Sequence, residues 1–197
     1  WVTYSELVKI AGGVPVIVGA GMEENYKITP AKLEAHITPR SRVFLFSSPC
    51  NPSGSVYSKA ELQGLAEVFK RHKDIYIISD EIYEYINFVG KHESIAQFGE
   101  IKDRVIIVNG LSKGFAMTGY RLGYIAADPT VAKGCEKIQG QFTSGANSVT
   151  QKAAVVALTT DLTPTHDMNT EFGRRRKRVM ELIAGIPGWK CVQPEGA

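Results

Sequence analysis

The sequence of 197 residues has few of the features that mark specialised classes of protein. It contains only three cysteines, Cys50, Cys135 and Cys191, which are widely spaced and form no C-x-x-C pair. An odd, scattered set argues against a disulfide framework and a zinc knuckle, and it favours a reducing compartment, so we expect a cytoplasmic protein. The four histidines share no ligand spacing, so a metal site has no support either.

Long apolar runs and a large charge of one sign are also absent. No run approaches the ~20 apolar residues that a membrane helix needs, so we expect no membrane partner. The formal net charge is only +3, which does not call for nucleic acid. One basic run, Arg174–Arg178, lies in a long helical pattern, and no aromatic platform for stacking bases accompanies it. Such a run is usually a solvated face, and we expect no nucleic-acid partner.

What the sequence does have is an alternation of short apolar runs with longer helical patterns, which indicates an α/β fold. Near-continuous apolar runs of this kind are typical of strands covered on both faces. The predicted strands are Val14–Gly19, Arg42–Ser47, Ile75–Asp80, Arg104–Asn109 and Leu122–Ala127.

Helical patterns separate these strands and then dominate the chain after Asp128-Pro129. Thr29 and Ser58 are predicted N-caps, and Ser58 with Glu61 forms a capping-box pattern. The change from alternation to helices alone indicates a core domain that leads into a second domain. The predicted helices are Pro30–Ile37, Ser58–Arg71, Val131–Gly140, Asn147–Leu158 and Pro164–Ala184.

Polar residues follow the predicted strands, where open α/β sheets bind ligands. Asn51 stands in a stiff turn between Pro49 and Pro52, for which a plain tight turn is the alternative explanation. Asp80 ends an apolar strand, and a carboxylate there is costly unless a cation or several donors meet it. Helix capping would also explain Asp80. Tyr83, three residues further on, could offer its phenol to the same ligand.

The next two loops carry a lysine and an arginine. Lys113 follows a strand, in a loop of small residues with a mostly uncharged neighbourhood. A partly buried lysine loses its charge more readily and becomes a nucleophilic amine, whereas an ordinary loop lysine keeps its head in water. Arg121 lies at the mouth of the following strand, where a guanidinium could clamp a phosphate bidentately.

Taken in order, these loops contain Asn-Pro-x-Gly, Asp-x-x-Tyr, Ser-Lys and a later Arg. This order resembles the fold-type I pyridoxal-phosphate aminotransferases of class I/II, especially the bacterial aspartate aminotransferase subgroup. The phrases Ser-Asp-Glu-Ile-Tyr-Glu and Ser-Lys-Gly-Phe-Ala-Met-Thr-Gly-Tyr-Arg-Leu-Gly-Tyr carry the resemblance, which covers essentially the whole chain. It implies a mostly parallel large-domain sheet, with Leu122–Ala127 as its antiparallel strand and about five strands supplied here. Residues 1–160 would be an incomplete large domain and 161–197 the start of a truncated small domain.

The resemblance also implies roles for individual residues around the cofactor, pyridoxal 5'-phosphate. Lys113 would form the Schiff base and move the substrate α-proton. Asp80 would pair with the pyridinium nitrogen and keep the ring an electron sink. Asn51 and Tyr83 would donate to the ring hydroxylate. Lys113, Asp80 and Tyr83 are therefore the predicted catalytic residues.

Further residues complete the implied site. Ser112 and Arg121 would bind the cofactor phosphate, and Trp1 would stack on its ring. The Asn51–Pro52 bond would be cis. The segment Gln141–Asn147 would lie near the interface of a homodimer.

The implied reaction is transfer of an amino group between an amino acid and a 2-oxo acid by a ping-pong mechanism. Aspartate and 2-oxoglutarate are the expected pair; aromatic, prephenate or other 2-oxo-acid substrates are the alternatives. The family's glycine-rich phosphate turn and its substrate-carboxylate arginine have no counterpart here, so we expect a fragment, which by itself could be catalytically inert. A dinucleotide fingerprint at Gly19-Ala20-Gly21 is rejected, because Glu24 occupies its third glycine position.

Overall fold

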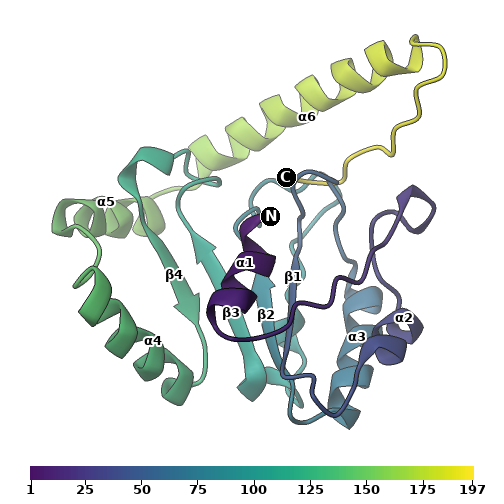
Figure 1. Cartoon of the computed structure of the whole chain (residues 1–197). Coiled ribbons are helices and arrows are strands. Elements are labelled where there is room, and N and C mark those ends of the chain that lie inside the picture. Colours follow the sequence, from purple (N-terminus) through teal and green to yellow (C-terminus); the bar gives the residue numbers. More distant parts are fainter.

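The computed structural model describes all residues, 1–197, and has the α/β fold that the sequence predicts (Figure 1). Its sheet has four strands in the order β1-β2-β3-β4. The first three are parallel and the last pair is antiparallel, as expected for the strand near Leu122. The strands are β1 (Val43–Ser47), β2 (Tyr76–Asp80), β3 (Val105–Gly110) and β4 (Gly123–Ala126).

One predicted strand is not formed. The run Val14–Gly19 is irregular and takes part in no backbone–backbone hydrogen bond. Val14 and Ile17 are 85% and 77% exposed, so neither side chain is packed against the sheet. A strand exists through its ladder of bonds to a neighbour, and this run has no strand beside it. The sheet therefore has four strands, and the expectation of about five was wrong.

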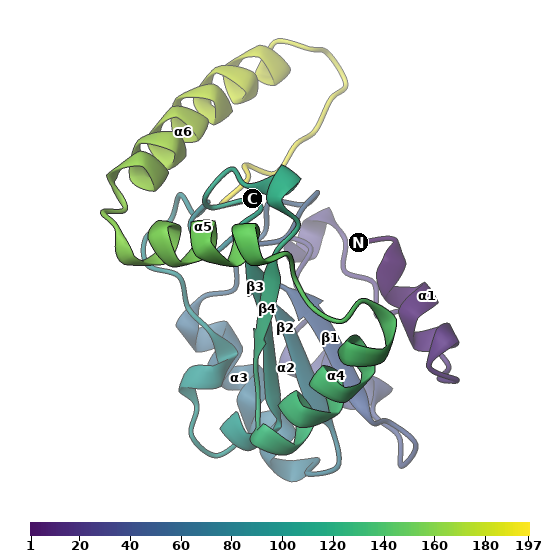
Figure 2. The same ribbon diagram turned by 90° about the vertical axis from the view of Figure 1, so that its left-hand side faces the viewer.

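Helices cover both faces of the sheet. Seen along the sheet, α3 lies on one side and α1 and α4 lie on the other (Figure 2). The helices are α1 (Thr3–Ile10), α2 (Pro30–His36), α3 (Lys59–Arg71), α4 (Pro129–Phe142), α5 (Ser148–Thr159) and α6 (Thr163–Ala184). Short 3-10 turns occur at Met22–Glu24, Ile95–Gln97, Lys102–Arg104 and Thr118–Tyr120.

Local chemistry sets the starts of α2 and α3 as predicted. The Glu61 N–H donates to Ser58 Oγ at 3.3 Å, and the Ser58 N–H donates to the Glu61 carboxylate at 2.7 Å, which completes the capping box of α3. Thr29 Oγ1 accepts from the Lys32 N–H at 3.2 Å at the start of α2. Thr29 and Ser58 are therefore confirmed as caps.

The core lies between the sheet and α3. Leu65 and Phe69 recur at helical spacing on α3 and pack with Ile77 of β2, and all three are fully buried. Each such side chain stabilises the fold by about 1.5–3 kcal/mol through burial. This packing fixes the parallel strands, and with them the loops at their carboxyl ends.

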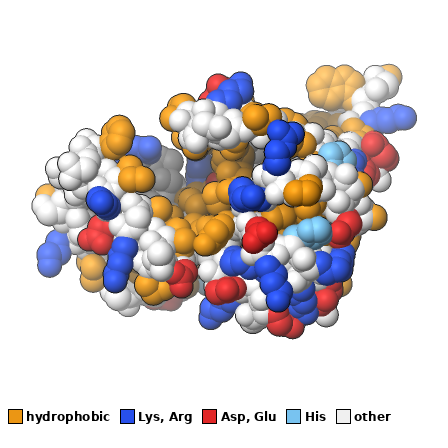
Figure 3. Space-filling model, turned by 60° about the horizontal axis from the view of Figure 1, so that its bottom comes forward, with side chains coloured by type: hydrophobic (Ala, Val, Ile, Leu, Met, Phe, Trp, Pro, Cys, Tyr) orange, Lys and Arg blue, Asp and Glu red, His pale blue; other side chains and the backbone are white.

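After α6 the chain returns to the body of the molecule (Figure 1). The N–H groups of Glu195 and Gly196 donate to Gly54 O at 2.7 and 3.0 Å, and the Ala197 N–H donates to Ile86 O at 2.8 Å. The last residues thus bind beside the loop that contains Asn51. No helix combines the length and apolar character needed to cross a membrane. Basic and acidic side chains are interspersed on the lower face, around a central apolar hollow (Figure 3).

Candidate active site

The residues singled out in the sequence lie at one edge of the sheet. Because β1, β2 and β3 are parallel, their carboxyl ends meet there. Asn51 follows β1, Asp80 is the last residue of β2, and Lys113 follows β3. The Asn51–Pro52 bond is cis, as predicted, and so is the Ser48–Pro49 bond, which was not predicted.

Three of the predicted residues form a cluster. Asn51 Nδ2 donates to the Tyr83 phenol oxygen at 2.9 Å. Lys113 Nζ lies 5.6 Å from the centre of the Tyr83 ring, in the range of a cation–π contact. Tyr83 is only 9% exposed, so burial holds its ring in place between the other two side chains. The structure thus joins segments that are about 30 residues apart in the chain.

Two hydrogen-bond donors stabilise the carboxylate of Asp80 at the end of β2. The Ile82 N–H donates to Oδ1 at 3.1 Å, and the Tyr4 phenol donates to Oδ2 at 2.5 Å. No helix begins at Asp80, so helix capping does not explain this residue. Burial and the hydrogen bond to Asp80 raise the pKa of the Tyr4 phenol, which keeps it a donor.

Tyr4 is a site residue that the sequence reasoning missed. It stands on α1, 76 residues from Asp80, and no local pattern connects the two. The available signal was its place one helical turn after Trp1, the residue that was predicted to stack on a ring.

The other predicted residues are less closely joined to the cluster. Ser112 lines the same cavity as Lys113. Arg121 has a left-handed backbone with φ 55°, and its Nη1 donates to Thr118 O at 2.7 Å. Trp1 is 71% exposed, and its indole N–H donates to Thr3 at 2.5 Å. No hydrogen bond links Arg121 or Trp1 to the cluster, so their roles stay predictions.

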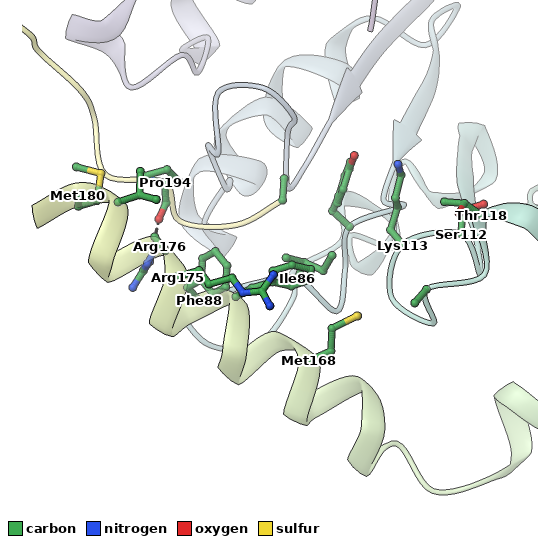
Figure 4. Close-up of a pocket in the computed structure, with 15 residues that line it drawn as sticks. Ile86, Phe88, Ser112, Lys113, Thr118, Met168, Arg175, Arg176, Met180 and Pro194 are labelled. Atoms are coloured by element: carbon green, nitrogen blue, oxygen red, sulfur yellow. Dashed lines mark hydrogen bonds between the residues drawn. The ribbon is translucent and has the colours of Figure 1, made fainter. Parts of the chain in front are cut away.

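A cavity of about 590 Å³ opens between these loops and α6 (Figure 4). Lys113, Arg175 and Arg176 are its charged lining residues, and no acidic residue lines it. A cavity whose walls carry charge of one sign favours an anionic ligand. The remaining lining residues are Tyr83, Ile86, Phe88, Ser112, Ala116, Thr118, Met168, Phe172, Val179, Met180, Pro194 and Ala197.

Arg176 corrects the interpretation of the basic run as a wholly solvated face. Its guanidinium lies 4.6 Å from the centre of the Phe88 ring, and its Nη1 donates to Pro194 O at 2.8 Å. Its Nε is buried without a partner. The neighbours Arg174 and Arg175 instead pair with Glu171 at the exposed surface.

Comparisons with known proteins agree with this geometry. The family model "Aminotransferase class I and II" matches residues 1–197. Aspartate aminotransferase from Geobacillus stearothermophilus is 42% identical over 200 residues, and aspartate/prephenate aminotransferase from Nitrosomonas europaea is 41% identical over 199; each alignment covers 100% of this chain and 50% of the relative. The crystal structure of the aspartate aminotransferase from Rhizobium meliloti superposes with a TM-score of 0.97 at 39% identity, over 100% of this chain and 50% of that one.

The chain therefore spans about half the length of the curated relatives it matches. Its α/β fold, its parallel strands with their polar loops and its full match to the family model lead to one assignment. The chain belongs to the aminotransferase class I and II family.

Proposed function

We propose that this chain carries the cofactor-binding centre of a pyridoxal-phosphate-dependent aminotransferase. The protein would move an amino group between aspartate and 2-oxoglutarate by a ping-pong mechanism, with Lys113 as Schiff-base lysine and proton shuttle. The observation that carries this proposal is the cluster in which Asn51 bonds Tyr83 and Lys113 lies against the Tyr83 ring.

The donors and acceptors of this site fit the cofactor. Asp80 is a carboxylate whose orientation is fixed by two donors, as a partner for a ring nitrogen requires. Asn51 and Tyr83 offer an amide and a phenol to the ring hydroxyl. Lys113 supplies the amine that would bind the aldehyde carbon and later hold and move the substrate α-proton. When bound, the cofactor would supply an electron sink for the charge left by that proton.

Phosphate binding by Ser112 and Arg121, and stacking by Trp1, belong to the same proposal. Arg121 is exposed, and its donation to Thr118 O occupies one of its five N–H groups, so other donors stay free for a phosphate. Trp1 stands one helical turn before Tyr4, which bonds Asp80, so it lies close in sequence to the site.

The cavity supports an anionic substrate, because its charged lining residues are all cationic. Amino and 2-oxo dicarboxylic acids meet this requirement, and the names of the relatives support aspartate as the donor. Prephenate is the second candidate, because several relatives are named for it as well. Phe88 and Phe172 in the cavity wall would suit its ring.

We extend the proposal to the whole protein as a cytoplasmic homodimer. Exposed apolar side chains lie within the segment Gln141–Asn147 and just after it, Phe142 of α4 at 83% and Val149 of α5 at 73%, and they support an interface there. We also propose a division into a large domain, 1–160, and the start of a small domain, 161–197. The projection of α6 away from the sheet supports that boundary (Figure 1).

Absorption spectroscopy tests the cofactor site. The chain is mixed with pyridoxal phosphate, and the visible band of the bound cofactor is recorded for wild type, Lys113→Ala and the control Lys137→Ala, which changes an exposed lysine of α4. We expect the band in wild type and in the control and its loss in Lys113→Ala. A band that persists in Lys113→Ala would refute the role of Lys113. A normal band without amino transfer from aspartate would identify the chain as an inert fragment.

A further inference from the structure

A buried carboxylate lies directly behind the site. Glu81 follows Asp80 and is only 3% exposed. Its Oε1 accepts from Ser79 Oγ at 2.8 Å and from Ser94 Oγ at 2.7 Å, and its Oε2 lies 2.8 Å from His92 Nε2. Because an ionised carboxylate only accepts hydrogen bonds, we assign the donated proton to His92 Nε2. Three donors thus converge on one buried acid.

Glu81 and Asp80 point to opposite faces of the sheet. Side chains alternate along an extended chain, and the bond between Ser79 and Glu81 shows that these two share a face. That face is covered by α3 and by the turn Ile95–Gln97, whereas Asp80 faces α1 through Tyr4. Glu81 is therefore behind the site and does not line it.

The Glu81 bonds connect the turn after β2 with a separate segment. Ser94 caps the turn Ile95–Gln97 by accepting from the Ala96 N–H at 3.2 Å, and it also donates to Glu81. The Glu81 N–H extends the sheet by donating to Val108 O at 2.9 Å. The backbone of Glu81 is thereby held to β3, and its side chain is held to the 92–97 segment.

A buried acid is a costly means of fixing a turn when apolar residues would pack there without a desolvation penalty. The surroundings of Glu81 are secluded from water, since it is only 3% exposed. Burial also raises the pKa of Glu84 on the same turn, while His92 opposes that rise. Hydrogen bonds are directional, and three of them restrict the backbone between Asp80 and Tyr83 more narrowly than apolar contacts do.

We propose that Glu81 is a positioning residue, which uses Ser79, Ser94 and His92 to hold Asp80 and Tyr83 in the geometry that the cofactor needs. This inference rests on the proposed function, because it assigns Asp80 and Tyr83 to the cofactor. Its structural half, the fixing of the turn by Glu81, can be measured without cofactor.

The experiment compares Glu81→Ala with Ile95→Ala in the full 197-residue chain. Ile95 is fully buried beside Ser94 and has no hydrogen bond to Glu81, so its truncation lowers stability in the same region without removing the acid. Glu81→Gln is the conservative variant, since its amide keeps one acceptor for the two serines and can donate to His92. Amide hydrogen exchange reports on the Ile82 N–H, which bonds Asp80.

We expect Glu81→Ala to accelerate exchange at Ile82 by about tenfold more than at the core amides of α3, because its removal leaves buried donors unsatisfied. Ile95→Ala should accelerate both sets equally, and Glu81→Gln should stay within about threefold of wild type. Equal local acceleration in Glu81→Ala and Ile95→Ala would overturn the positioning role.

The visible band of bound pyridoxal phosphate provides the second measurement. Glu81→Ala should weaken cofactor binding by about tenfold and Ile95→Ala by less than about threefold. Faster exchange at Ile82 in Glu81→Ala without weaker cofactor binding would overturn the proposal that Glu81 supports the cofactor site. If the wild-type chain formed no band, the proposed function would fail, while the exchange data would still decide whether Glu81 holds the turn.

Discussion

Replacing Tyr4 by phenylalanine isolates the contact between α1 and the end of β2. The substitution keeps the ring and removes the phenol that donates to Asp80 Oδ2 at 2.5 Å. Asp80 then keeps only the Ile82 N–H as a donor within the protein. Because Tyr4 is half-buried, water can replace part of the lost interaction.

The expected loss of stability follows from the charge on Asp80. A hydrogen bond to a charged group is worth about 1.5–3 kcal/mol when its partners are well buried. For this half-buried pair we expect a loss of about 1–2 kcal/mol. With a urea m-value of about 2 kcal/mol/M, the unfolding midpoint should fall by about 0.5–1 M.

Urea unfolding followed by circular dichroism measures this change. Tyr76→Phe is the matched control, because Tyr76 lies on β2, is 43% exposed and uses its phenol in no hydrogen bond. The control should stay within the about 0.5 kcal/mol that is usual for surface changes. If Tyr4→Phe moved the midpoint no further than the control, the bond to Asp80 would contribute nothing and the reasoning would be refuted.

A double-mutant cycle assigns the effect to the pair. Asp80→Ala and Tyr4→Phe are made singly and together, and their unfolding free energies are compared. We expect Tyr4→Phe to lower the free energy of unfolding by at least about 1 kcal/mol less in the Asp80→Ala variant than in wild type. Additive losses would mean that Tyr4 acts through other neighbours.

Two further predictions concern the terminal segment and alkaline pH. A Cβ at Gly196 would lie 2.7 Å from Ile86 O, so Gly196→Ala should displace residues 194–197. Hydrogen exchange at the Phe88 amide, which bonds Glu195 O, should then become faster. Gly185→Ala is the control, because its Cβ would have its nearest atom at 3.5 Å, and equal protection of Phe88 in both variants would contradict the prediction. Burial raises the pKa of Tyr57 to about 12 from 10.0, so the folded state holds this proton more tightly than the unfolded chain. The tighter binding of this proton stabilises the fold by about 2–3 kcal/mol below pH 10, and this stabilisation is lost as the pH rises through 12. In urea unfolding between pH 9 and 12, the free energy of unfolding should fall less steeply with pH for Tyr57→Phe than for wild type. Parallel falls would argue against this role of Tyr57.

Local features of the structure could be predicted because their causes are local. The capping box at Ser58 and Glu61 depends on residues three apart, and it forms as expected. Apolar runs such as Ile75–Asp80 become strands because their side chains are buried in the core. The run Val14–Gly19 is also rich in Val and Ile, but it contains Pro15, which cannot donate to a ladder, and it has no neighbouring strand. Apolar composition alone cannot reveal whether such a neighbour exists.

In the candidate site, too, some features could be predicted from the sequence and others could not. The order of the loops and their resemblance to a family pointed to Asn51, Asp80, Tyr83 and Lys113, because parallel strands bring their carboxyl ends together whatever the detailed packing. The contact from Tyr4 to Asp80 could not be read from the chain, since it depends on where α1 is packed. The same is true of Arg176, which contacts Phe88 although Arg174 and Lys177 on the same helix are exposed.

The sequence by itself thus determined the α/β class, the starts of α2 and α3, and the placing of polar loops at the carboxyl ends of the parallel strands. Hydrogen-bonding chemistry and hydrophobic periodicity act over a few residues and can be recognised in the sequence. Only the tertiary structure decided which polar groups meet, including the two donors on Asp80 and the three donors on Glu81. The contacts from Tyr4, His92 and Ser94 join segments at least 11 residues apart, and the path of the folded chain alone sets their distances.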